Sequence, residues 1–382
     1  MRIGALTDIP LLGRATLRRE FDRLRSDDLD RRSWRLNATG GSTGEPVRFI
    51  QDRAADTWRL AIELLFDQWS GVRPGMRRLR LWGSEPDLFA GREPLKERLY
   101  RWRRNEITLN SFRMTLAQMR TYAERINAWR PDHILGYADS LYELSRFFEH
   151  SGLAVHSPES LMSSSGTLLP HQRGTIERVF RAPVFDRYAA REFGAMAGED
   201  GTHQGMVVAA PGNEVEILRP DGAPAGPGEE GEMVVTSLTN YAMPLIRYRI
   251  GDLACPAERG SARTGWPVLS KVTGRVTDTL VRPGGGVVSA LYFIHLVGVV
   301  LRAAWIRRFQ VVQEDLSRIV VHLVLEPPAT ESDPEFLPRI RELADKIRLV
   351  MGPGCAVEFQ VREEILPEPS GKYRYVISRV PR

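Results

Sequence analysis

The run Asn37–Val47 constrains this chain more than any other part of its sequence. It holds three glycines, three hydroxyl side chains and a proline, which suits neither a core strand nor a core helix. Glycines let backbone N–H groups converge on an anion, and the hydroxyls of Thr39, Ser42 and Thr43 add uncharged donors. No Gly-Lys-Ser/Thr ends the run, so it is not the P-loop of kinases and GTPases. We predict a phosphate-binding loop, with a polar turn before the strand-like Val47–Ile50 as the alternative.

The composition is that of a globular protein with a basic balance. The chain has 382 residues, of which 42% are hydrophobic and 26% charged, and a formal net charge of +5. This length suits one large core and a smaller one. Only four of the basic residues are lysines, and the arginines are interleaved with acids, so we expect no nucleic-acid partner. The densest basic runs, Arg77–Arg80 and Arg98–Arg104, are interpreted as solvated helix faces, with binding of a phosphorylated ligand as the alternative.

Cysteine usage and apolar stretches indicate a cytoplasmic protein. Cys255 and Cys355 lie far apart and form no metal or redox motif. The segment Met1–Arg25 is charged throughout and lacks the apolar stretch of a signal peptide. The longest apolar stretch, Val287–Leu301, is too short to span a membrane and is interpreted as buried strand and helix. We expect no membrane span and no disulfide framework.

Helical and strand periodicities alternate through the first half of the chain. Apolar residues recur at helical spacing over Asp52–Trp69, as Leu60, Leu64, Leu65 and Trp69 do, and again from Leu116 to Trp129, where Pro131 ends the helix. Three short apolar runs fit the intervening strands: Leu79–Trp82, His133–Gly136 and Val184–Tyr188. The alternation predicts an α/β fold, whose ligands gather beyond the carboxyl ends of the strands.

From Gly205 onward the pattern changes. Three short runs separated by Pro/Gly turns suit a small β-rich subdomain: Met206–Ala209, Val215–Leu218 and Glu232–Thr236. Four later runs suit a compact α+β lobe of three strands and a helix: Phe309–Val312, Ile319–Leu325, Pro334–Val350 and Ala356–Val361. We therefore predict a large domain over residues 1–274, made of stacked α/β subdomains plus the β-rich subdomain, and a small mobile α+β domain over residues 275–382.

Further clusters carry side chains suited to nucleotide chemistry. In chain order they are Ser163–Thr167, Tyr188–Gly194, Asn240–Asp252, Gly274–Asp278 and Ser370–Arg374. The second places an aromatic ring and the carboxylate of Glu192 within one turn of chain. The third ends in an aspartate behind a glycine, and the last contains one of the four lysines, Lys372.

Together with the loop at Thr39–Pro46, this ordered set resembles the adenylate-forming superfamily of acyl-CoA synthetases, peptide-synthetase adenylation domains and luciferases. Within it the chain is similar to the phenylacetate–CoA ligase branch, and most of all to members associated with capsular polysaccharide synthesis, in which the string Asn240–Asp252 is characteristic. The resemblance covers nearly the whole chain. The string and the terminal Ser370-Gly371-Lys372 are its specific parts, whereas Gly274–Asp278 is weak by itself.

The resemblance and the chemistry together suggest roles for these residues. A carboxylate that attacks the α-phosphate of ATP brings two anions together, so donors and cations must be aimed at the phosphates. The loop residues are expected to close over the β- and γ-phosphates: Thr39, Gly40, Gly41, Ser42, Thr43 and Gly44. Glu192 is expected to hold Mg²⁺ through the nucleotide, Tyr188 to stack on adenine and Asp252 to accept from both ribose hydroxyls. The resemblance implies that Ser165, Gly166 and Thr167 line the adenine pocket.

The predicted cation of the adenylation step is Lys372, since a flexible ammonium on a mobile lobe can reach the acyl and phosphate oxygens and then leave. The resemblance also implies that Arg275 contacts the nucleotide and that Asp278 is the hinge about which the small domain rotates between adenylation and thioester formation. Structural alternatives exist for each assignment: a surface lysine at 372, a surface or capping carboxylate at 192, core packing at 188, a turn aspartate at 252 and a surface ion pair of Arg275 with Asp278.

Several positions depart from the family pattern. Glu45 follows Gly44 and adds repulsion near phosphates, and Ala189 stands where glycine is common. Where relatives carry a Cys/His zinc site, this chain has Asp200, His203 and Ser261–Thr264, with Cys255 out of place. A zinc site needs four well-placed ligands, so we predict no zinc site and interpret His203 as a polar loop residue. Relatives usually have additional sequence before the segment that resembles Pro10–Leu17, so we expect either a misplaced start or a lost cap over the acyl pocket.

The leading hypothesis is an ATP-dependent ligase that converts a small carboxylic acid into an acyl-adenylate and then transfers the acyl group to coenzyme A. ATP, Mg²⁺ and coenzyme A are the expected cofactors and co-substrates. Alternatives are an amine such as an amino sugar or a carrier protein as the acceptor, and a nucleotide-binding protein without catalysis. The sequence leaves a homodimer open. Four residues face the acyl pocket or pack in the core: Asn110, Phe112, Tyr137 and Ala138.

Overall fold

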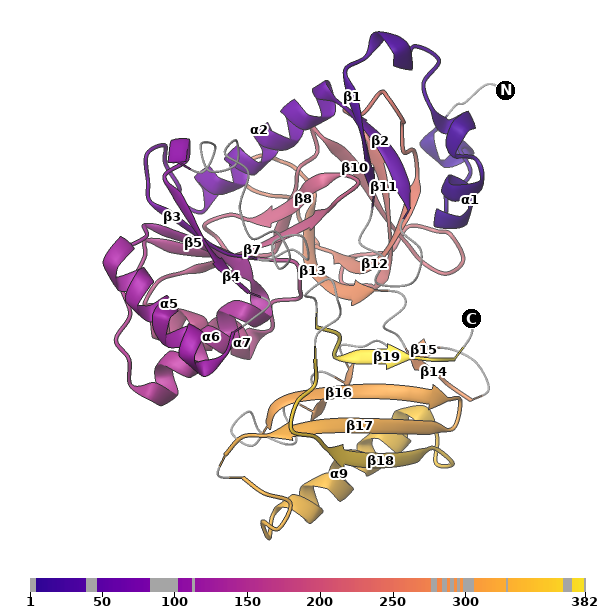
Figure 1. Ribbon diagram of the computed structural model, residues 1–382. Helices are drawn as coiled ribbons and strands as arrows, with labels where there is room; N and C mark the ends of the chain where they lie inside the picture. Colours follow the sequence, from indigo (N-terminus) through magenta and orange to yellow (C-terminus); the bar gives the residue numbers. More distant parts are fainter. Residues whose placement is uncertain are drawn as a thin grey trace. The chain divides into compact units, whose positions relative to one another are not determined.

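The computed structural model divides into two compact units (Figure 1). The described residues are 5–38, 47–82, 102–111, 114–275, 280–283, 287–288, 292–293, 296–297, 306–327, 329–366 and 373–380. Met1–Ile250 and Ala254–Val272 form the bulk of the first unit. The second unit consists of Gly251–Leu253, Thr273–Glu368 and Lys372–Arg382.

A single sheet of eleven strands organises the first unit. Its parallel part contains, in spatial order, β4 (Glu106–Asn110), β3 (Arg78–Trp82), β5 (His133–Tyr137), β6 (Ser160–Ser164) and β7 (Val184–Ala190). The order continues with β8 (Gly194–Glu199), β9 (Met206–Val208), β13 (Val268–Arg275), β12 (Tyr248–Pro256), β11 (Gly231–Ser237) and β10 (Asn213–Leu218). The pairs β7–β8, β8–β9, β9–β13 and β10–β11 are antiparallel. The short strands predicted beyond Gly205 therefore extend the sheet that the α/β half begins.

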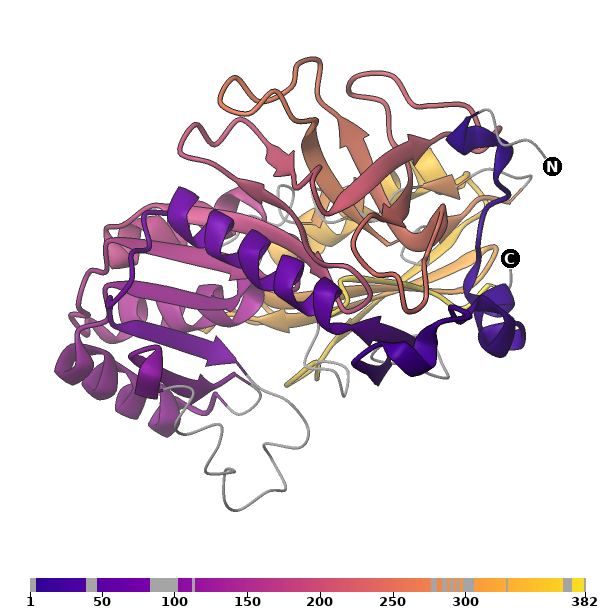
Figure 2. The same cartoon turned by 90° about the horizontal axis from the view of Figure 1, so that it is seen from above.

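Helices cover both faces of this sheet. On one face lie α5 (Leu116–Trp129), α6 (Ala138–Ser151) and α7 (Pro170–Phe180), and on the other lies α2 (Arg53–Trp69) (Figures 1 and 2). Strand alternation separates the two faces, because Ile134 of β5 packs with the first group whereas its neighbour Leu135 packs with α2. The predicted helices at 52–69 and 116–129 and the strands between them are confirmed. Arg130, in the left-handed conformation, caps α5 just before Pro131.

Helix α2 lies very close to strand β8 because glycines face it. A Cβ at Gly198 would lie 3.1 Å from Cγ of Phe66, and one at Gly194 would lie 2.8 Å from Cγ of Arg59. Gly194 also has a φ of +79°, which favours glycine by itself. Ile62, one turn along the same face, makes a similar close approach to Gly212. The side chains at 59, 62 and 66 thus fill the space that a side chain at Gly194, Gly212 or Gly198 would need.

Of the four apolar residues that mark α2 in the sequence, Trp69 is buried and Leu65 packs against the core, but the other two are exposed. Leu60 and Leu64 are 46% and 52% exposed, whereas Ile62 and Phe66 are buried. Asp67 is buried as well, and its Oδ2 accepts from Nη1 of Arg78 at 2.7 Å. The interpretation of Arg77–Arg80 as a solvated helix face is therefore wrong, because this run enters strand β3 and Arg78 forms a buried ion pair there.

A short hairpin precedes α2. Strands β1 (Trp34–Ala38) and β2 (Arg48–Asp52) pair antiparallel, with Ala38 opposite Arg48. Asp52 caps α2 by accepting from the backbone N–H of Ala55 at 2.9 Å. The amide of Asn240 donates to the carbonyl of Ile50 at 2.8 Å and thereby holds β2 in place. The remaining N-terminal elements are the helix α1 (Arg14–Arg19) and 3-10 turns at Leu6–Asp8, Phe21–Leu24 and Leu29–Arg31.

One carboxyl group is buried between the last two parallel strands. Asp186 of β7 is 7% exposed, and its Oδ1 accepts from the hydroxyl of Ser163, its register partner on β6. Burial is the main cause that raises the pKa of Asp186 to about 7; the bond from Ser163 and the charge of Arg173 oppose this rise, and the charge of Glu199 adds to it. The carboxyl is therefore expected to change its protonation state near neutral pH although it is buried.

The second unit is an α+β lobe. Strands β18 (Ala356–Val361), β17 (Arg318–Leu325), β16 (Ile306–Asp315) and β19 (Val376–Ser378) form its sheet in that order. The central pair is antiparallel, and each outer strand is parallel to its neighbour. Helix α9 (Phe336–Met351) packs on the sheet through residues such as Leu343 and Ile347. Strands β14 (Leu280–Val281) and β15 (Val287–Val288) form a small separate pair. The predicted strands and helix of this lobe are confirmed, and β19 is an addition.

We predict that Gly198→Ala lowers the free energy of unfolding of the protein by about 1–3 kcal/mol, because the new methyl group overpacks the contact with Phe66. Gly174→Ala is the matched control, since its Cβ would meet nothing within 4 Å among the described atoms. That control should be neutral or stabilising by up to about 1 kcal/mol. Urea unfolding measures both. Equal stability of the two variants would contradict the prediction, and Phe66→Leu should partly rescue Gly198→Ala.

A second prediction concerns Asp186. Its pKa is raised in the folded state, so between about pH 4 and about pH 7 the folded protein binds more protons than the unfolded chain and this group's contribution to stability falls as pH rises. Asp186→Asn keeps the shape and removes the titration. The free energy of unfolding of the variant relative to that of the wild type should therefore rise by a few kcal/mol (about 1.4 per pKa unit) between pH 4 and pH 7.5. Urea unfolding of both proteins across this range tests the prediction, and a difference independent of pH would refute it.

Candidate active site

The carboxyl ends of the parallel strands lie level at one edge of the sheet. Trp82 at the end of β3 is paired with Asn110 at the end of β4, and Tyr137 at the end of β5 is paired with Ser164 at the end of β6. The rings of Trp82 and Tyr137 lie 4.2 Å apart between centroids. Ligands of α/β sheets bind outside such an edge. Two of the residues proposed for the acyl pocket, Asn110 and Tyr137, thus lie at the expected place, and Ala138 is fully buried at the start of α6. Phe112 lies outside the described residues.

The predicted adenine loop leaves β6 at the same edge. Ser165 adopts a φ of +55°, which turns the chain sharply after the strand. Ser165 and Thr167 are half-buried, and Gly166 is exposed. A Cβ at Gly166 would lie 3.7 Å from that of Ala138. The loop therefore lies beside the start of α6, next to Tyr137.

Tyr188 lies on the next strand, β7. Its ring is half-buried and packs against the core cluster that includes Phe193 and Tyr248. The register of β7 with β8 shifts between Tyr188 and Ala189, and such irregularities commonly re-aim a side chain beside a functional site. The partial burial of Tyr188 is compatible with both the core-packing interpretation and the predicted stacking on adenine.

Glu192 lies in the turn between β7 and β8 and is 6% exposed. The turn is held from the hairpin, because Nε2 of Gln51 donates to the carbonyl oxygens of Arg191 at 3.1 Å and of Glu192 at 3.2 Å. The carboxylate of Glu192 also acts on its surroundings. Burial first, and then this charge, raise the pKa of Tyr248 to about 12. A buried carboxylate in a fixed turn is unlike the surface or capping carboxylate that the sequence left as the alternative.

The same hairpin brings the ends of the predicted phosphate loop to the turn of Glu192. Ala38 and Arg48, which flank the loop, are paired with each other. Nη1 of Arg191 donates to the carbonyl oxygen of Ala38 at 3.1 Å. Residues 39–44 themselves, with Glu45, lie outside the described residues. The structure therefore brings together the two anchors of the predicted phosphate loop, Glu192, Tyr188 and the predicted adenine loop on neighbouring strands.

The remaining predicted residues belong to other segments. Asp252 lies within β12, in the stretch Gly251–Leu253 that groups with the second unit, so its distance from the residues above is not described. Gly251 before it has a φ of +86°. Arg275 ends strand β13, and its side chain, like Asp278 and Lys372, lies outside the described part of the chain.

The segment directly after Lys372 is firmly attached to the sheet of the second unit. The hydroxyl of Tyr373 donates to the carbonyl oxygen of Phe309 at 2.6 Å. Nε2 of Gln310 donates to the carbonyl oxygen of Arg374 at 2.9 Å. From Val376 the chain continues as β19 alongside β16.

The residues that stand where relatives carry a zinc site have hydrogen-bond partners nearby in the chain. Oδ1 of Asp200 accepts from the hydroxyl of Thr202 at 2.6 Å, and Nδ1 of His203 lies 3.2 Å from Oε2 of Glu199. Cys255 is buried. No group of three or more His, Cys, Asp or Glu side chains suited to a metal ion occurs among the residues that the structure describes.

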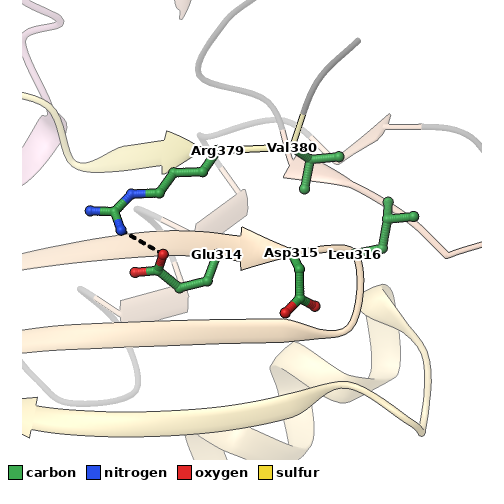
Figure 3. A pocket seen from close by; sticks show the side chains of 5 residues that line it. All are labelled: Glu314, Asp315, Leu316, Arg379 and Val380. Carbon is green, nitrogen blue, oxygen red and sulfur yellow. Dashed lines mark hydrogen bonds and ion pairs between the residues drawn. The ribbon is translucent and has the colours of Figure 1, made fainter.

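A hollow of about 350 Å³ lies in the second unit at the end of β16 (Figure 3). Its lining residues are Glu314, Asp315, Leu316, Arg379 and Val380. Nη1 of Arg379 donates to Oε2 of Glu314 at 2.6 Å, and Asp315 accepts from Ser317. Arg379 and Glu314 are thus paired with each other within the hollow, and its lining contains none of the predicted site residues.

Sequence reasoning missed the residues that join the β1–β2 hairpin to the turn of Glu192 and to α2. Gln51 and Arg59 belong to no motif, so no local signal marks them. Arg247 does lie in the characteristic string, yet its role is to bind Glu216 through two bonds of 3.0 Å and to donate to the carbonyl of Ile9 at 2.8 Å. The string therefore anchors the N-terminal segment as well as leading to Asp252. None of the described helices is long and apolar enough to cross a membrane.

Comparisons with known proteins agree with this architecture. Residues 280–379 match the family model of the CapK C-terminal domain. Over 357 residues the chain is 22% identical to Protein CapK of Staphylococcus aureus, which covers 90% of this chain and 74% of that protein. A local match of 43% identity over 70 residues relates it to phenylacetate-coenzyme A ligase of Escherichia coli (strain K12), covering 18% of this chain and 16% of that enzyme.

Solved structures of ligases are similar in fold. A 2-hydroxyisobutyryl-CoA ligase in complex with R3-HIB-AMP has a TM-score of 0.73 over 97% of this chain and 80% of its own, at 15% identity. The anthranilate CoA ligase AuaEII in complex with anthranoyl-AMP has a TM-score of 0.62 at 16% identity, covering 89% of this chain and 65% of that one. The amide bond synthetase McbA from Marinactinospora thermotolerans has a TM-score of 0.60 at 17% identity, covering 86% and 65%. The predicted fold class is confirmed. The chain has the fold of the adenylate-forming ligases and is related in sequence to CapK and the phenylacetate–CoA ligases, the branch that its motifs predict.

Proposed function

We propose that this chain is an AMP-forming carboxylate ligase. In the proposed first step a carboxylate oxygen of the substrate attacks the α-phosphorus of ATP, the bond to the β-phosphate oxygen breaks, and pyrophosphate leaves. The observation that carries the proposal is the junction of the β1–β2 hairpin with the turn of Glu192. It holds the ends of a Gly/Ser/Thr-rich loop beside a buried carboxylate, at the strand edge where α/β folds bind ligands.

The nucleotide would lie across the ends of β6 and β7. The half-buried ring of Tyr188 would stack on adenine, and the turn at Ser165 would present the backbone of Gly166 and Thr167 to the edge of the base. Asp252 would accept from the ribose hydroxyls, and Arg275 would contact the nucleotide. Residues 39–44 would close over the β- and γ-phosphates.

The residues present fit a magnesium ion that is carried mainly by the nucleotide. Mg²⁺ in nucleotide sites typically has one or two carboxylate ligands plus phosphate oxygens and waters, and Glu192 is one buried carboxylate in a fixed turn. When bound, the ion would neutralise charge on the phosphates. Glu192 would orient this ion, and the hydroxyls of Thr39, Ser42 and Thr43 would bind the phosphate oxygens as uncharged donors.

Lys372 is proposed as the cation that stabilises the negative charge developing between the acyl oxygen and the α-phosphate. The second unit would carry it, with Asp278 as the hinge. In the second step a thiolate sulfur attacks the acyl carbonyl carbon and AMP leaves. We propose coenzyme A as the acceptor, since the phenylacetate-coenzyme A ligase and the 2-hydroxyisobutyryl-CoA ligase are named for it. The amide bond synthetase among the structural neighbours favours an amine as the second candidate.

ATP–pyrophosphate exchange tests the adenylation step. Wild-type protein should exchange label only with the right acid, drawn from a panel of aromatic, fatty and sugar acids, and only with Mg²⁺. Lys372→Ala should lower the exchange rate by at least about 100-fold, within the range lost with a single transition-state donor. Lys346→Ala is the matched control, because that lysine forms only an exposed pair with Glu342 in α9 and should leave exchange unchanged.

Each outcome of this experiment has a definite meaning. Full exchange by Lys372→Ala would remove the proposed role of that lysine. ATP binding without exchange for any acid would favour a nucleotide-binding protein without catalysis. Where exchange occurs, product analysis with coenzyme A, amines and carrier proteins identifies the acceptor.

Substitution of Tyr188 tests the adenine assignment. Tyr188→Ala should raise the KM for ATP roughly 5- to 150-fold, since stacking of a base on an aromatic side chain contributes about 1–3 kcal/mol. Tyr188→Phe retains the ring and should stay close to the wild type. Steady-state exchange kinetics give both values. An unchanged KM in Tyr188→Ala would support the core-packing interpretation instead.

A further inference from the structure

We propose that Gln51 is a positioning residue of the candidate active site, whose side-chain amide fixes the hairpin of the predicted phosphate loop against the turn of Glu192. The proposal rests on the proposed function only for its kinetic consequence. Its structural part concerns two segments of the first unit that are about 140 positions apart in sequence and are joined by hydrogen bonds of known length.

The two N–H groups of Gln51 are both directed at the turn. Nε2 donates to the carbonyl oxygens of Arg191 and Glu192. The side chain is 1% exposed, so water cannot replace these bonds. Loss of the donors would leave two carbonyl oxygens of the turn without this partner, directly at the residue that is expected to bind the magnesium ion.

The oxygen of the same amide faces the hairpin and α2. Oε1 accepts from Nδ2 of Asn37 at 3.0 Å and from Nη1 of Arg59 at 3.0 Å. Asn37 lies two residues before Thr39, where the predicted loop starts. All four hydrogen-bonding positions of the amide are therefore used, which also determines its orientation.

Two further contacts hold this arrangement together. Nη1 of Arg191 donates to the carbonyl oxygen of Ala38, so turn and hairpin are joined at a second point. Arg59 is confined against Gly194, where an added Cβ would lie 2.9 Å from its Nε. The guanidinium of Arg59 thus lies close to the start of β8 while it donates to the oxygen of Gln51.

The consequence for catalysis follows from distance. The phosphate loop and Glu192 must act on the same triphosphate, and a displacement of about 1 Å can cost about 100-fold in rate. Without Gln51 the hairpin and the turn would remain folded, but the hydrogen bonds that fix their relative position through this side chain would be lost. The defect should therefore appear in the requirement for Mg²⁺ and in kcat/KM for the magnesium–ATP complex, in addition to stability.

The chain offers a matched control. Asn240 is also a buried amide, and its Nδ2 donates to two carbonyl oxygens, those of Ile50 at 2.8 Å and Met243 at 3.2 Å. It bonds to the backbone of strand β2, and none of its described side-chain hydrogen bonds reaches the turn of Glu192. Gln51→Met and Asn240→Leu each remove a buried amide of similar connectivity, so they should lose similar stability.

Two measurements on the full chain test the proposal. In hydrogen–deuterium exchange, Gln51→Met should raise amide exchange at least tenfold in peptides covering residues 189–194 and 34–38, whereas Asn240→Leu should not affect 189–194. In ATP–pyrophosphate exchange, Gln51→Met should lower kcat/KM for magnesium–ATP at least tenfold and raise the Mg²⁺ concentration for half-maximal rate. Asn240→Leu should stay within threefold of the wild type.

Unchanged amide exchange at 189–194 in Gln51→Met would overturn the proposal, as would equal kinetic defects in the two variants. If Gln51→Met does not fold, Gln51→Glu keeps the acceptor for Asn37 and Arg59 while losing both donors, and it should show the same local increase in amide exchange. If the wild type shows no ATP–pyrophosphate exchange with any acid, the proposed function fails, and the hydrogen–deuterium measurement still decides the role of Gln51.

Discussion

The contact of helix α2 with strand β8 sets the position of everything around the candidate site. It is close because Gly194 and Gly198 leave room for Arg59 and Phe66, and protein interiors tolerate little change in such a contact. The hairpin of the predicted phosphate loop leads directly into α2. The depth at which the helix lies therefore decides where the hairpin ends and whether it meets the turn of Glu192. The two glycines of β8 therefore influence the geometry of the candidate site through packing, without contacting a ligand themselves.

The characteristic string Asn240–Asp252 combines structural and chemical tasks. Its first residue holds strand β2, and Arg247, in the left-handed region with a φ of +48°, binds Glu216 and the N-terminal segment. Only its last residue, Asp252, is expected to touch the nucleotide. Sequence strings that identify a family can therefore persist because they join distant parts of the fold, and their residues need not all contact a ligand.

Local periodicity predicted where helices and strands lie in the sequence, but not which of their faces are buried or which distant residues they contact. The strand Ala356–Val361 and the helix Leu116–Trp129 follow from alternation and helical spacing alone. Leu60 and Leu64 suggested the wrong buried face of α2, because the helix buries Asp67 against an arginine of β3 and fits its other inward residues to glycines. The role of Gln51 could not be predicted, since its partners lie about 140 positions away and a single glutamine has no periodicity. The motifs at Ser163–Thr167 and Tyr188–Gly194 do lie at neighbouring strand ends, because parallel strands bring their loops to one edge; their role in binding stays a prediction.

The attachment of the segment after Lys372 has a mechanical consequence. Tyr373 and Arg374 are bonded to strand β16, and adjacent Cα atoms are only about 3.8 Å apart. If Lys372 serves adenylation as proposed, this attachment would couple its position to that of the lobe. The rate of the cycle would then depend on the diffusive rotation of a whole domain, which is slower than a side-chain rotation.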